Sequence, residues 1–119
     1  MTAPNIKSPT TITGKTIFYP VTTTLAAALT NAAASNKVLK INSVYCANVD
    51  GTVNAEIDLT VYNGTTDGYI AKTVTVPFDA TQVLVSKDVY IYLEEGWSLR
   101  AKANAALDLE LVISYEEIS

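Results

Sequence analysis

The chain has 119 residues, a formal net charge of −4 and a sequence pI near 4.6, with one cysteine and no histidine. This length fits a single domain that can bury its own core, and the cysteine and histidine counts exclude an intrachain disulfide and a Cys/His zinc site. The eight basic residues are scattered from Lys7 to Lys102, which excludes a clustered phosphate-binding patch, so we expect no nucleic-acid partner.

The composition also indicates the fold class and the compartment. Sixteen threonines, twelve valines, nine isoleucines and seven tyrosines favour a pleated, half-buried surface, which predicts an all-β protein. There is no run of about 18 apolar residues and no secretory signal at the N-terminus. We therefore expect synthesis in the cytoplasm and no membrane partner.

Residues 1–14 have the composition of an extended N-terminal arm, and residues 15–119 that of a single β-sandwich domain. Prolines in the arm cannot donate to a ladder, so its backbone hydrogen bonds go to solvent or to a partner. The arm residues that we expect at an interface are Pro4, Ile6, Pro9 and Ile12.

The first two elements differ in clarity. Residues 16–21 predict a strand with Pro20 at an edge or at the strand end. Residues 22–34 allow either a short helix through Leu25 and Leu29, four apart, or a strand. The threonine run at the start of this segment favours the strand.

From Lys37 onward apolar and polar residues alternate with period 2, which predicts half-buried strands. The first long strand is expected to place Leu39, Ile41, Ser43, Tyr45 and Ala47 on one face, and Asp50–Gly51 to close a hairpin. The inward-facing sets predicted after it are Ala55, Ile57, Leu59 and Val61; Ile70, Val74, Val76 and Phe78, interrupted by Lys72; Val83 and Val85; Val89, Ile91 and Leu93; Trp97, Leu99, Ala101 and Ala103; and Leu107, Leu109, Leu111 and Ile113.

About eight such strands, spaced by eight to twelve residues and joined by short turns, predict one antiparallel two-sheet sandwich. Its topology is expected to be jelly-roll-like or Ig-like.

The sequence offers few residues that could act in catalysis. Without histidine there is no usual general base, and Cys46 has the setting of a packing residue in a strand. Neighbours in a strand point to opposite faces, so Glu94–Glu95 and Glu116–Glu117 cannot converge on one atom. The first pair predicts a solvated turn and the second a charged end that shields the last strand.

The oxygen-rich run from Asn48 to Glu56 has neither the length nor the spacing of a calcium loop, and a hairpin turn is the favoured interpretation. We therefore expect no enzyme, no metal and no cofactor.

Tyr90 and Tyr92 are predicted to share one exposed face opposite Val89, Ile91 and Leu93. Exposed aromatic pairs mark contact surfaces, either for another protein subunit or for a glycan. Trp97 is predicted to belong to the core.

Five blocks of the chain resemble small β-rich virion proteins of tailed bacteriophages, especially those that infect cyanobacteria. The blocks are Lys37–Tyr45, Ala47–Thr52, Val76–Thr81, Tyr92–Gly96 and Ile113–Ile118, and the resemblance extends from about Thr22 to the C-terminus. It implies a β-sandwich subunit on the exterior of the virion, most simply a capsid decoration or cement protein. Its partners would be the major capsid protein or other virion proteins.

Two alternatives stay open: a neck, tail or fibre protein, and a carbohydrate-binding module for attachment to the host. Small exterior subunits commonly form closed rings, so we expect a homotrimer.

Overall fold

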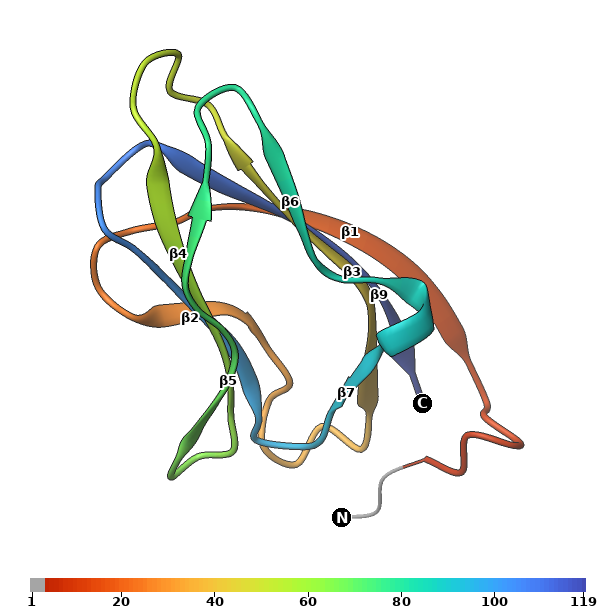
Figure 1. The fold of residues 1–119 in the computed structure, drawn as a ribbon. Helices are drawn as coiled ribbons and strands as arrows, with labels where there is room; N and C mark the ends of the chain where they lie inside the picture. The colour runs from red at the N-terminus through yellow and green to blue at the C-terminus, as the bar shows by residue number, and fades with distance from the viewer. Residues whose placement is uncertain (1–3) are drawn as a thin grey trace.

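The computed structural model describes residues 4–119, which form ten elements: nine strands and one short 3-10 turn. All strand pairs are antiparallel, and the strands lie in two sheets that face each other (Figure 1). The predicted all-β fold of two packed antiparallel sheets is confirmed.

The larger sheet has the order β1–β9–β3–β6, with β7 also paired to β3. Both β6 and β7 therefore lie along the same edge of β3, separated by the 3-10 turn η1. The bounds are β1 (Ile12–Pro20), β9 (Leu109–Ile118), β3 (Val38–Asn48), β6 (Thr81–Val85), η1 (Lys87–Val89) and β7 (Ile91–Leu93). Because η1 divides one edge strand in two, the structure has nine strands where the sequence predicted about eight.

The smaller sheet has the order β2–β8–β4–β5. Its strands are β2 (Ala26–Thr30), β8 (Ser98–Ala103), β4 (Ala55–Tyr62) and β5 (Asp67–Val76). Strand β2 lies within the ambiguous segment 22–34, so the strand prediction is confirmed there.

The connections differ from the predicted hairpins. Among residues 4–119, β4 and β5 are the one pair of consecutive strands that hydrogen-bond to each other. The turn at Asp50–Gly51 instead joins β3 in the larger sheet to β4 in the smaller one. The hairpin prediction was wrong because turn residues specify a chain reversal and not which strands pair after it.

The N-terminal boundary lies earlier than residue 15. Strand β1 begins at Ile12, and its pairing with β9 runs from Ile12↔Ile118 to Pro20↔Glu110. The carbonyl of Ser119 accepts the N–H groups of Thr10 and Thr11 at 2.6 and 3.0 Å. Residues 12–14 therefore belong to the sheet, Thr10 and Thr11 are tied to the residue that follows β9, and Pro20 ends an edge strand as predicted.

A β-bulge at Asn42 reverses the side-chain alternation of β3. Ile41 pairs with Tyr115 and Ser43 with Ser114, so Asn42 is an extra residue on β3. Leu39 and Ile41 are buried before the bulge, whereas Cys46 is fully buried and Tyr45 is 42% exposed after it. The prediction that Ser43, Tyr45 and Ala47 continue the face of Ile41 was therefore wrong.

A second irregularity lies in β5. Ile57 pairs with Val74 and Leu59 with Ala71, which leaves Lys72 and Thr73 looped out opposite Asp58. Thr73 has φ +53°, an uncommon conformation for a β-branched residue, and its N–H donates to the Asp58 carboxylate at 2.6 Å. The interruption of the apolar pattern at Lys72 marks this bulge in the sequence.

Three residues predicted to face inward are exposed because they lie beyond the ends of their strands. Phe78 (48% exposed) precedes Asp79, whose φ is +56°; Val89 (65%) ends η1; and Leu107 (83%) has φ +68° in the turn before β9. In β9 itself the prediction is confirmed, since Leu109, Leu111 and Ile113 are fully buried.

Two buried asparagines hold the connections between the sheets. The Asn48 amide nitrogen donates to the carbonyls of Val53 and Val76 at 3.0 and 2.9 Å, and its oxygen accepts from Asp50 N–H at 3.0 Å. Asn31 in the same way donates to the carbonyls of Lys37 and Leu93. Each amide binds backbone groups at a strand end and in an adjoining loop, Val76 and Leu93 being the last residues of β5 and β7.

Replacing Asn48 with alanine is expected to lower the free energy of unfolding by about 2 kcal/mol or more, because buried carbonyls lose their donors. Urea denaturation of the N48A and wild-type chains measures this difference. Asn54→Ala is the control, since exposed Asn54 accepts one bond from Phe78 N–H and its loss should cost less than about 1 kcal/mol. Equal losses in the two variants would contradict the assigned role of Asn48.

Candidate interaction surface

Tyr90 and Tyr92 lie together on the outer face of the larger sheet. Tyr92 is on β7 opposite Lys40 of β3, and Tyr90 directly follows η1. Their ring centroids are 5.4 Å apart and the ring planes meet at 78°, an edge-to-face contact. The predicted juxtaposition of the two rings is therefore present, although Val89 does not alternate with them because η1 interrupts the strand.

Charged groups surround this aromatic pair. The ammonium of Lys40 lies 4.4 Å from the centroid of the Tyr90 ring, a cation–π distance. Glu116 pairs directly with Lys40 across the strands, and its carboxylate accepts from the Asn42 amide at 3.1 Å. Desolvation, and then the neighbouring Tyr90 and Glu116, raise the pKa of the Tyr92 hydroxyl. The Tyr92 hydroxyl therefore stays protonated and can donate a hydrogen bond at neutral pH.

The N-terminal segment reaches the same end of the sheet. Pro4 and Ile6 line a hollow of about 290 Å³ together with Val38, Tyr92 and Glu94. The segment is not fully extended, because Ser8 N–H donates to the Asn5 carbonyl at 3.0 Å and makes a turn. Sequence reasoning identified these residues separately, whereas their convergence with Tyr92 depends on the fold.

The remaining two predicted interface residues are placed differently. Ile12 is 54% exposed on β1 and lies in a cross-strand row with Ile118 and Val38, which extends toward the hollow. Pro9 is half-buried between the turn and β1.

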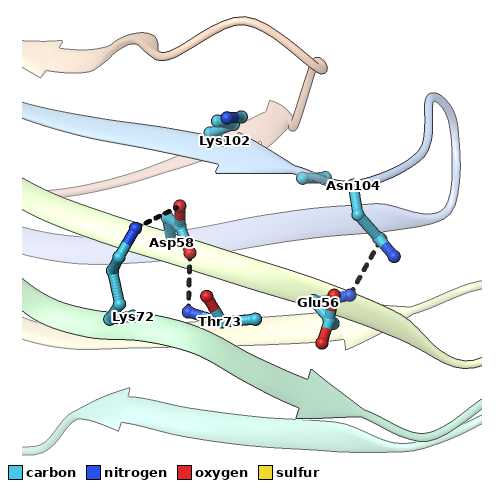
Figure 2. A pocket seen from close by; sticks show the side chains of 7 residues that line it. Glu56, Asp58, Lys72, Thr73, Lys102 and Asn104 are labelled. Carbon is cyan, nitrogen blue, oxygen red and sulfur yellow. Dashed lines mark hydrogen bonds and ion pairs between the residues drawn. The ribbon is translucent and has the colours of Figure 1, made fainter.

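A separate hollow of about 210 Å³ lies on the outer face of the smaller sheet (Figure 2). It is lined by side chains of β4, β5 and the end of β8: Glu56, Asp58, Lys72, Thr73, Lys102, Ala103 and Asn104. Lys72 approaches the Asp58 carboxylate at 4.0 Å, and Glu56 N–H donates to Asn104 at 2.9 Å. Asp58 is thus held by its own strand neighbours, so the hollow has the character of a solvated polar surface.

The last glutamates of the chain have a different role from the predicted one. Strand β9 lies between β1 and β3, inside the sheet, so Glu116 and Glu117 do not shield an edge. The Glu117 carboxylate instead accepts from Lys37 at 2.7 Å and from Lys15 at 3.1 Å. The carboxylate thus joins β1 to the residue that precedes β3. Both hydrogen bonds lower the pKa of Glu117, and the bond from Lys37 has the larger effect.

The two other motifs weighed in the sequence are turns. Trp97 N–H donates to the Glu94 carbonyl at 3.0 Å across Gly96, whose φ of +80° suits glycine. In the oxygen-rich run, the Asp50 carboxylate accepts from Thr52 N–H, Thr52 Oγ1 and Val53 N–H at 2.7 to 3.0 Å. These bonds lower the pKa of Asp50, and the bond from Thr52 N–H has the largest effect.

No protein-family model matches the chain, and a search of curated proteins gives no match. Within residues 4–119, no group of three or more His, Cys, Asp or Glu side chains is placed to hold a metal ion, and no helix is long and apolar enough to cross a bilayer.

Replacing Glu117 with glutamine is expected to lower stability at pH 7 by less than about 1 kcal/mol, since the ion pairs are partly exposed. The folded-state pKa of Glu117 lies below the ordinary value of 4.5, so its contribution is present above that pH and is lost as the pH falls through the folded-state pKa. Urea denaturation at a series of pH values from 7 downward should therefore show a difference that shrinks as the carboxylate becomes protonated. The control is Glu110→Gln on the exposed side of β9; a difference for E117Q that persists in acid would contradict the assignment.

Cys46 should not react with thiol reagents in the folded protein. The side chain is fully buried, and burial raises the pKa of its thiol to about 12. At pH 8 the thiolate fraction is then about a thousandfold below that of an exposed cysteine. Labelling rates with iodoacetamide in native buffer and in urea measure this contrast, and comparable rates would show that the site opens readily.

Proposed function

We propose that this chain is a non-enzymatic structural protein of a bacteriophage virion, a jelly-roll subunit that decorates the capsid exterior. The observation that carries the proposal is the strand order. With β6 and β7 counted as one interrupted strand, the strands in chain order form sheets 1–8–3–6 and 2–7–4–5. This order supports an eight-stranded jelly roll, an architecture found in viral capsid and lectin domains.

The sequence blocks that resemble phage virion proteins make the proposal more specific than the fold can. They support attachment to the major capsid protein, or to another virion protein if the chain belongs to the neck, tail or fibres. The chain would be made in the host cytoplasm and would then join the exterior of the particle.

The placement of the groups that could react supports a non-enzymatic role. The Cys46 thiol is buried and protonated, and the carboxylates of Asp50, Asp58 and Glu117 accept hydrogen bonds from their own neighbours. An enzyme needs a nucleophile and a base within reach of one substrate atom. The surfaces that expose apolar side chains are instead suited to contact with another protein.

Carbohydrate binding has less support from the aromatic geometry. A sugar ring stacks on an open aromatic face, whereas Tyr90 and Tyr92 meet edge to face and Lys40 lies over the Tyr90 ring. The two rings and Lys40 therefore form a packed cluster and do not offer an open platform for a sugar ring.

The proposal predicts that the purified chain binds shells assembled from the major capsid protein of the phage that encodes it. Removing residues 1–9 should leave the fold intact, because pairing with Ser119 begins at Thr10, and should weaken shell binding, because Pro4 and Ile6 are lost from the hollow beside Tyr92. Co-sedimentation with shells measures binding, and circular dichroism measures the fold.

A chain whose first nine residues are replaced by a Gly/Ser segment of equal length separates the loss of side chains from the loss of length. Mass spectrometry of purified particles gives the copy number relative to the major capsid protein. Hundreds of copies per particle would support decoration, about a dozen would indicate the neck, tail or fibres, and absence from the particle would refute the virion proposal.

A further inference from the structure

Four outward-facing apolar side chains, three of them exposed, form a continuous row across the outer face of the larger sheet. Phe18 of β1 pairs with Val112 of β9, Val112 with Tyr45 of β3, and Tyr45 with Val83 of β6. Phe18 is 80% exposed, Val83 49% and Tyr45 42%, while Val112 is half-buried between its neighbours. Four adjacent strands span about 14 Å, so the row crosses the sheet from edge to edge.

The packing of this domain does not require these side chains to be apolar. Ile17 and Tyr19, on either side of Phe18, pack against the core, so Phe18 points away from it. Tyr45 faces outward because of the bulge at Asn42. Contiguous exposed apolar patches, unlike single exposed apolar residues, mark contact surfaces.

A second row, four residues further along β1 and β9, carries complementary charges. It contains Gly14 of β1, Glu116 of β9, Lys40 of β3 and Tyr92 of β7, each paired with the next. Small polar side chains, Thr16, Ser114 and Ser43, lie between the two rows. The face therefore offers an apolar row and, about 13 Å away along the strands, a row with one acid and one base side by side.

We propose that this face binds the same face of a second copy of the chain. A two-fold axis that runs along the strands, between β9 and β3, exchanges β9 with β3 and β1 with β6 and β7. It places Phe18 against Val83 of the second copy and Val112 against Tyr45 of the second copy.

The same axis brings each Glu116 opposite Lys40 of the other copy, and the space above Gly14 opposite the bulky Tyr92. Each row is thus complementary to itself, which is what an isologous contact requires. Sheets packed in this aligned manner are usual in sandwiches.

This contact goes beyond the proposed function, because it needs no virion component and is present in the purified protein. It predicts a dimer, whereas the sequence led us to expect a trimer. It also leaves the hollow at Pro4 and Ile6 beside the dimer contact, where a third protein could bind.

The first test is the solution mass of the full chain, measured by sedimentation velocity over a range of concentrations. We expect twice the 12.7 kDa mass of one chain. Phe18→Asp should raise the dimer dissociation constant at least about tenfold without changing the circular dichroism spectrum, because the side chain is on the surface. Phe78→Asp, the same change at an exposed phenylalanine outside the sheet, is the matched control and should leave the dimer intact.

The second test uses the charged row. In a K40E dimer both Glu116 side chains would face a like charge, and in an E116K dimer both Lys40 side chains would, so each variant alone should dissociate. Mixed in equal amounts, the two variants should form a heterodimer in which both facing pairs have opposite charges. A defect confined within one chain would not be repaired by mixing.

The proposal is overturned if the wild-type chain is monomeric at every concentration up to about 1 mM. A dissociation constant above about 1 mM corresponds to a binding free energy weaker than about −4 kcal/mol. A trimer, a dimer that F18D leaves intact, or K40E and E116K chains that fail to associate on mixing would overturn it equally.

Discussion

The extra residue at Asn42 is the constraint on which both faces of the larger sheet depend. An ideal strand would keep Ile41 and Tyr45 on one side, whereas the bulge moves Tyr45 outward and turns Cys46 and Asn48 inward. The inward phase allows Asn48 to bond the carbonyls of Val53 and Val76 and so to hold the larger sheet against the smaller one. The outward phase completes the apolar row between Val112 and Val83. One irregularity in β3 therefore supports the core and a contact surface together.

The outer face of this sheet carries two surfaces of different character. Near β7, Tyr90 and Tyr92 lie with Lys40 beside the hollow that Pro4 and Ile6 help to form. At the other end, the row from Phe18 to Val83 is apolar, and Tyr45 and Val83 line a hollow that extends to Lys40 and Glu116. In the dimer that we propose, Lys40 and Tyr92 lie in the contact together with the apolar row, and the hollow lined by Pro4 and Ile6 lies at its border.

Local patterns predicted the elements well. The alternation of Leu109, Leu111 and Ile113 identified a half-buried strand, and the same rule placed Tyr90 and Tyr92 side by side. The prediction failed wherever period 2 was extended through a bulge, as at Tyr45 and Val83, or past a strand end, as at Leu107. A bulge is stabilised by the partner strand, and no residue type in β3 announces it; Lys72 in β5 is the exception, because a charge in an inward position indicates that the alternation stops there.

The sequence by itself determined the all-β class and the approximate positions of most strands, because these follow from propensity and alternation. Only the tertiary structure decided which strands pair. Strands β3 and β4 are adjacent in the chain and separated into different sheets, while β1 and β9 lie at opposite ends of the chain and pair over their whole length. Pairing depends on backbone hydrogen bonds that are alike for every residue, so the choice of partner is made by the packing of the two sheets and is not encoded in any one segment.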